Sequence, residues 1–149
     1  MFRQFQIAYP VGVFGSLLYS FIFYHFNRIG HYNLTAYYMV PLMILVILWI
    51  CQGEFLFVKQ KNSGLGFQIS PTHKGYVSLI ILVITSTHSY YAFFGLLLLI
   101  VATLWITSRS FSVANLLNGL CAGIILILCT ILNKIPSLLY NLHNGPSYV

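Results

Sequence analysis

Long apolar runs separated by short polar connections divide this chain. Three of the runs, residues 8–26, 37–58 and 113–133, have a length that fits one helical crossing of a hydrocarbon core, which needs about 20 residues. The fourth run, residues 76–106, contains no acid, lysine or arginine, and it would extend about 46 Å as a single helix. Because a hydrocarbon core is only about 30 Å thick, this run is too long for one crossing.

A polar cluster at residues 85–89, followed by Tyr90 and Tyr91, is the natural place for a turn inside the long run. In one continuous helix the cluster would lie near the bilayer midplane, where unsatisfied polar groups are costly. In a helical hairpin the same residues reach the headgroup region, where tyrosine is favoured. The first arm of that hairpin is long enough only if it begins near residue 70.

The pattern therefore predicts an all-α integral membrane protein, a small polytopic bundle of five transmembrane helices in a single domain. The alternative is a bundle of four helices, with residues 76–106 as one long helix. The expected elements of the 149-residue chain are helices at residues 8–26, 37–58, 70–86, 90–106 and 113–133, a loop at 59–75 and a tail at 134–149.

Composition and charge agree with this class of protein. Hydrophobic residues make up 59% of the chain and charged residues only 5%, whereas an ordinary soluble domain carries about 25% charged residues. The net charge is +6, but the basic residues lie singly at the ends of the apolar runs, as membrane topology and contact with anionic lipid require. We therefore expect the lipid bilayer as a partner, and no nucleic acid.

The distribution of lysine and arginine also predicts an orientation. Five basic residues fall on one side of the five-helix arrangement and two on the other, so the N-terminus is expected on the cytoplasmic side, or on the matrix or stromal side. The expected location is a bacterial plasma membrane or an organellar inner membrane. The basic residues on the two sides are Arg3, Lys59, Lys61, Lys74 and Arg109, against Arg28 and Lys134.

Small residues at helical spacing indicate two helix-packing seams. A pair four residues apart in the first run, and a stripe of glycine, alanine and asparagine in the last, would let a neighbouring helix approach closely. The alternative for the asparagines of the stripe is that they line a polar path. The expected packing residues are Gly12 and Ser16 in the first run, and Asn115, Asn118, Gly119, Ala122 and Gly123 in the last.

Few side chains could carry chemistry. Glu54 is the only acidic side chain, and a lone intramembrane acid can serve as a proton-coupling site. The structural alternative is an interfacial glutamate close to Lys59 or Lys61. His25 and His88 fall at the same depth in the five-helix arrangement and could ligate a metal or haem. No catalytic residue and no cofactor is predicted, although haem or quinone binding by the histidines is an alternative.

Three functions follow from these observations. The first is association, as a subunit, accessory or scaffold of a larger membrane protein complex or as a homo-oligomer, because packing surface is abundant and ionisable groups are scarce. The alternative is a small oligomeric proton-coupled transporter or channel that uses Glu54. The second alternative is a haem-, quinone- or lipid-active membrane enzyme that uses His25 and His88. The sequence lacks phosphate-binding glycine loops, nucleophile elbows and zinc-protease motifs.

Overall fold

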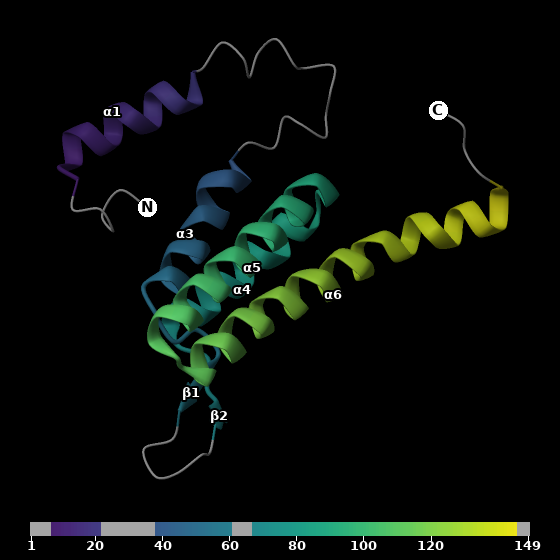
Figure 1. Ribbon diagram of the computed structural model, residues 1–149. Helices are drawn as coiled ribbons and strands as arrows, with labels where there is room; N and C mark the ends of the chain where they lie inside the picture. Colours follow the sequence, from purple (N-terminus) through teal and green to yellow (C-terminus); the bar gives the residue numbers. More distant parts are fainter. Residues whose placement is uncertain (1–6, 22–37, 61–66, 146–149) are drawn as a thin grey trace.

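The computed structural model of the chain describes residues 7–21, 38–60 and 67–145, which fold almost entirely as helix (Figure 1). Within these residues there are five α-helices, which confirms the predicted number, and one two-stranded antiparallel ribbon, which was not predicted. The elements are α1 (Tyr9–Ser20), α3 (Met39–Cys51), β1 (Val58–Gln60), β2 (Phe67–Ile69), α4 (His73–Ser86), α5 (Ser89–Ser110) and α6 (Val113–Asn144).

The chain turns between α4 and α5, at Thr87 and His88. The backbone N–H of His88 donates to the carbonyl of Thr85, and the Thr87 hydroxyl donates to the carbonyl of Ile84. These bonds satisfy the last carbonyls of α4, so the helix ends without stranded polar groups. The predicted hairpin is therefore present, and the alternative of one long helix over residues 76–106 is wrong.

The second predicted helix, residues 37–58, is longer than the helix in the structure, α3, which ends at Cys51. Helix α3 ends at Cys51 because Gly53 adopts a positive φ of 71°, which glycine takes up without steric cost. The N–H of Glu54 reaches the carbonyl of Trp49, and the N–H of Gly53 reaches that of Ile50. This pair of bonds is a Schellman motif, which ends a helix and redirects the chain. Residue 37 lies outside the described residues.

The expected loop at 59–75 also needs correction. Strands β1 and β2 pair antiparallel, with Val58 opposite Ile69, and α4 then begins at His73 rather than at residue 70. The start of α4 is set by Thr72, whose hydroxyl oxygen accepts a hydrogen bond from the N–H of Gly75. A threonine in this position is a helix N-cap, and it satisfies one of the free N–H groups of the first turn.

The last helix is longer than predicted and the first is shorter. Helix α6 continues to Asn144 through Pro136, so the expected tail at 134–149 is helical over most of its length. Proline costs one backbone hydrogen bond inside a helix but does not end α6 here. Of the first predicted helix, residues 8–26, the structure shows α1 as far as Ser20, and residues 22–26 lie outside the described residues. In Figure 1, α1 lies apart from the other helices.

Helices α3, α4, α5 and α6 form an up-and-down bundle whose core is apolar. The bundle has a ribbon end, where β1 and β2 lie, and a turn end, where α4 meets α5 (Figure 1). Helices α3 and α5 run in the same direction, since Gly95 lies against Met43 and Gly53 lies near Ile106. As a result, aromatic residues of the two helices fall at matching ends. Tyr38 and Tyr90 lie toward the turn end, and Trp49 and Trp105 toward the ribbon end.

A close helix contact in the bundle joins α5 to α6 at Gly119. A Cβ atom added at Gly119 would overlap the side chain of Thr103, which is buried and donates its hydroxyl to the carbonyl of Leu99. At Gly123, one turn further along α6, an added Cβ would meet only the Leu96 methyl group at 3.5 Å, which is an ordinary contact. Only the first of these two glycines is therefore required by packing.

We expect Gly119→Ala to destabilise the protein and Gly123→Ala to leave it unchanged. The first substitution overpacks the α5–α6 contact, which costs roughly 1–3 kcal/mol in comparable cores, whereas the second fills available space. Thermal unfolding of both variants in the same detergent, followed by circular dichroism, measures the difference. Equal unfolding temperatures for the two variants would contradict the close contact at Gly119.

Candidate functional site: a buried strap at the ribbon end

A non-helical segment, residues 54–58, crosses the ribbon end of the bundle, and we call it the strap. Leu56, Phe57 and Val58 are buried, although they belong to no helix and only Val58 enters a strand. Buried backbone N–H and C=O groups outside a helix must find other partners. The functional question at this site is therefore which groups supply those partners.

Asn118, on α6, supplies most of them. Its Oδ1 accepts hydrogen bonds from the backbone N–H groups of Leu56, Phe57 and Val58, at 3.2, 2.8 and 2.9 Å, and its Nδ2 donates to the carbonyl of Val58 at 2.8 Å. The side chain is only 2% exposed. One amide thus makes four hydrogen bonds to a segment about 60 residues away, and three of them converge on its single oxygen. The Asn118 side chain therefore holds the strap to α6.

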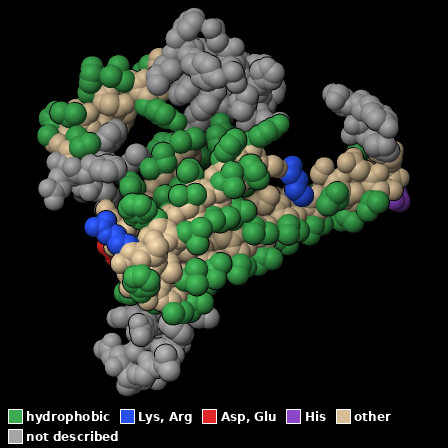
Figure 2. Space-filling view, viewed as in Figure 1, with side chains coloured by type: hydrophobic (Ala, Val, Ile, Leu, Met, Phe, Trp, Pro, Cys, Tyr) green, Lys and Arg blue, Asp and Glu red, His purple; other side chains and the backbone are tan. Residues whose placement is uncertain are grey.

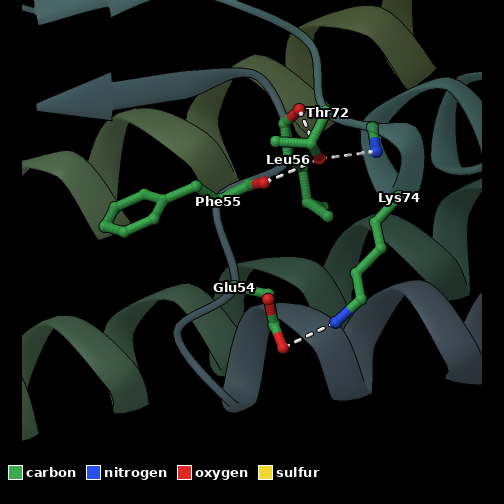
Figure 3. A network of polar contacts seen from close by, with 6 residues as sticks. Glu54, Phe55, Leu56, Thr72 and Lys74 are labelled. Atoms are coloured by element: carbon green, nitrogen blue, oxygen red, sulfur yellow. Dashed lines mark hydrogen bonds and ion pairs between the residues drawn. The ribbon is translucent and has the colours of Figure 1, made fainter.

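The start of α4 holds the strap from another side (Figure 3). The Thr72 hydroxyl donates to the carbonyl of Phe55 at 2.9 Å, and the N–H of Thr72 donates to the carbonyl of Leu56 at 3.0 Å. Gly75 lets the two backbones touch, because a Cβ atom there would overlap the Leu56 carbonyl oxygen. The strap is therefore fixed between α4 and α6, and the side chain that caps α4 also bonds the strap.

Glu54 begins the strap and forms an ion pair. Its Oε1 lies 2.6 Å from the Nζ of Lys74 (Figure 3), and the same Nζ lies 6.0 Å from the centre of the Trp49 ring. The two charged side chains are 37% (Lys74) and 42% (Glu54) exposed, a setting in which such a pair contributes about 0–1 kcal/mol. The partner of Glu54 is Lys74, whereas the sequence had suggested Lys59 or Lys61. The only acidic side chain of the sequence is thus paired with a base, and the role of Glu54 in proton coupling stays a prediction.

The other predicted packing residues fall into two groups. On α6, Asn115, Gly119, Ala122 and Gly123 are buried, and the Asn115 amide donates to the Ser110 hydroxyl at 2.8 Å. On α1, the Ser16 hydroxyl donates to the carbonyl of Gly12 at 2.8 Å, and this helix lies away from the bundle. The predicted stripe of α6 therefore faces the interior of the bundle. Gly12 is itself buried.

Of the predicted histidine pair, only His88 lies among the described residues. His25 lies outside the described residues, so the structure does not place it beside His88. The His88 Nδ1 shares a hydrogen bond with the Thr87 hydroxyl at 2.9 Å, and its ring lies 6.2 Å from that of Tyr91. Among the residues that the structure describes, no three histidine, cysteine or acidic side chains come together as a metal site.

Sequence reasoning missed Thr72, Gly75 and the strap itself. Two local signals were present. Gly53 stands where a helix-ending glycine is common, and Thr72 directly follows Pro71, a residue that favours a break before a helix. No local signal identifies the backbone that Asn118 bonds, because the two segments are joined only by the folded bundle.

A search of known protein families, of characterised protein sequences and of solved structures finds no match to this chain. The class of protein is therefore defined by the fold and the site alone. It is a small helical bundle in which a buried irregular segment is fixed by one asparagine and one threonine.

We expect Asn118→Leu to destabilise the protein by about 3 kcal/mol or more, because it leaves three buried N–H groups unpaired, at roughly 1–3 kcal/mol each. Asn115→Leu is the matched control, since Asn115 lies one turn away on α6 and its amide donates to the Ser110 hydroxyl near the surface. Its loss should cost about 1 kcal/mol or less. Thermal unfolding of the two variants under identical conditions compares them, and equal losses would remove the special role of Asn118.

Proposed function

We propose that this chain is an integral membrane protein whose five helices cross the bilayer and whose function is association with other membrane proteins. The membrane part of the proposal is supported by α5 and α6, which are both long and apolar enough to cross a bilayer. The outer faces of α4, α5 and α6 carry many large exposed apolar side chains, and Figure 2 shows hydrophobic side chains over one face of the bundle. A water-soluble bundle would carry charged and polar side chains on those faces.

Helices α3 and α4 are shorter, and the strap explains how they could still belong to a membrane bundle. Their 13 and 14 residues extend about 20 Å each, less than the ~30 Å of a hydrocarbon core. The strap continues the buried path of α3 beyond Cys51, since Leu56 and Phe57 lie in the core. Non-helical backbone is tolerated at membrane depth only where protein groups satisfy it, and Asn118 and Thr72 do so here.

The charged residues support an orientation within this proposal. Lys74 and Arg109 lie at the ribbon end, and Lys134 lies toward the turn end. Lysine and arginine are enriched in cytoplasmic loops, so the ribbon end would face the cytoplasm, or the matrix or stroma. With five crossings, the N-terminus lies on that same side.

The observation that carries the association proposal is the contrast between interior and surface. The side-chain amides of Asn115, Asn118 and Asn133 are bonded to other parts of the bundle, to Ser110, to the strap and to Ser86 respectively. The described surface offers apolar side chains instead of convergent polar groups. Such a molecule has contact area to offer a partner, and the exposed apolar side chains of α1, which lies apart from the bundle, add more.

Native-size analysis tests this proposal directly. The tagged chain, extracted from its own membranes in a mild detergent, should run as a particle larger than one chain, and cross-linking before extraction should capture the same partner. Asn115→Leu should preserve the particle and Asn118→Leu should weaken it, because the second variant loses the strap. A folded monomer with no cross-linked or co-purifying protein would contradict association, and release of the chain by alkaline carbonate would contradict membrane insertion.

A further inference from the structure

The C-terminal part of α6 leaves the bundle at the turn end (Figure 1). The last described bond between α6 and another helix is made by Asn133, whose Nδ2 donates to the Ser86 hydroxyl at 2.7 Å. From residue 131 to residue 145, every residue is exposed. The segment from Lys134 to Asn144, which we call the extension, therefore adds about 16 Å of helix with no bundle helix beside it.

One side of the extension is apolar, and this side continues the exposed apolar face of the bundle part of α6. Residues three or four apart lie on the same face of a helix. The stripe follows that spacing without interruption from the middle of α6 to its last turn, and Figure 2 shows green side chains along this edge. Its exposed members are Leu120, Ile124, Leu128, Ile131, Ile135, Leu138 and Leu142.

The opposite side changes character where the extension begins. Before Asn133 the exposed surface of α6 is apolar, and from there on it carries amide, hydroxyl and basic groups. A helix with one apolar and one polar side, rich in basic rather than acidic groups, is typical of segments that lie in the membrane interface. The polar residues are Asn133, Lys134, Ser137, Asn141, His143 and Asn144.

We propose that the extension lies along the membrane surface at the turn end, with its apolar stripe in the boundary between headgroups and acyl chains. This inference rests on the proposed membrane insertion. The stripe continues the lipid-facing side of the part of α6 that crosses the bilayer. Beyond the hydrocarbon core, the stripe stays in contact with lipid only if the helix bends toward the membrane surface. Pro136, which lacks a backbone N–H, removes one helical bond at the start of the extension and eases that change of direction.

Lipid is a better occupant of the stripe than a second copy of this chain. The sequence contains a single acidic side chain, Glu54, and that side chain is paired with Lys74 at the ribbon end. A second copy therefore offers no free acidic side chain to Lys134 or His143. Lipid phosphate groups lie at the depth where the extension would rest, and they complement both basic residues.

Spin labels on the full chain in nanodiscs of phosphatidylcholine and phosphatidylglycerol test this inference. The free thiols Cys51, Cys121 and Cys129 are first replaced by alanine, and unchanged helicity by circular dichroism is required of each variant. Leu142→Cys places a label on the stripe, and Ser137→Cys places one about 140° around the helix. Ile124→Cys, on the same stripe within the bundle, is the control for membrane insertion. Accessibility to oxygen, which dissolves in lipid, is compared with accessibility to a water-soluble nickel complex.

We expect the label at residue 142 to favour oxygen several-fold over the label at residue 137, at a depth of about 5–10 Å below the phosphates. If residues 142 and 137 both favour nickel while residue 124 favours oxygen, the extension stands in water, and this inference alone fails. If the label at residue 142 is shielded from both reagents, protein covers the stripe and the inference is again wrong. If all three labels favour nickel, the proposed membrane insertion fails as well.

Discussion

The need to satisfy buried backbone outside a helix is the constraint on which this structure depends. A helix bonds its own N–H and C=O groups, but the strap between α3 and β1 cannot, and it passes through apolar surroundings. Asn118 meets that need with four hydrogen bonds from one amide. The position of α6 is thereby coupled to the end of α3, and both are coupled to the start of α4 through Thr72.

The same constraint explains the ends of the bundle. At the turn end, hydroxyl groups of Thr87 and Ser86 return to nearby helix carbonyls, and Asn133 bonds Ser86 from α6. At the ribbon end, the Schellman motif at Gly53 closes α3 before the strap begins. The polar groups named here are thus bonded, while the outer faces of α4, α5 and α6 remain apolar. An apolar outer surface of this kind, unlike that of a soluble protein, supports the proposed place in a membrane and a function exercised through contact.

Sequence reasoning succeeded where a local rule decided the outcome. The turn at Thr87 and His88 follows from the cost of placing a polar cluster in the middle of an apolar helix, and it was predicted on that ground. The end of α3 was missed although Gly53 signals it, because the apolar run continues to Val58 and hydrophobicity alone favoured a longer helix. The extension was missed because the apolar run was expected to end at residue 133, whereas α6 continues through Pro136. The bond from Asn118 to the strap could not be predicted, since it joins segments about 60 residues apart and depends on the assembled bundle.

Amide hydrogen exchange at the strap, measured on the full chain in lipid nanodiscs, tests the central claim most directly. If Asn118 fixes the strap, the N–H groups of Leu56, Phe57 and Val58 exchange as slowly as those in the middle of α5, and they lose that protection in Asn118→Leu while the middle of α5 keeps its own. Exchange of these three amides at the rate of an unprotected loop in the unaltered protein would contradict the account.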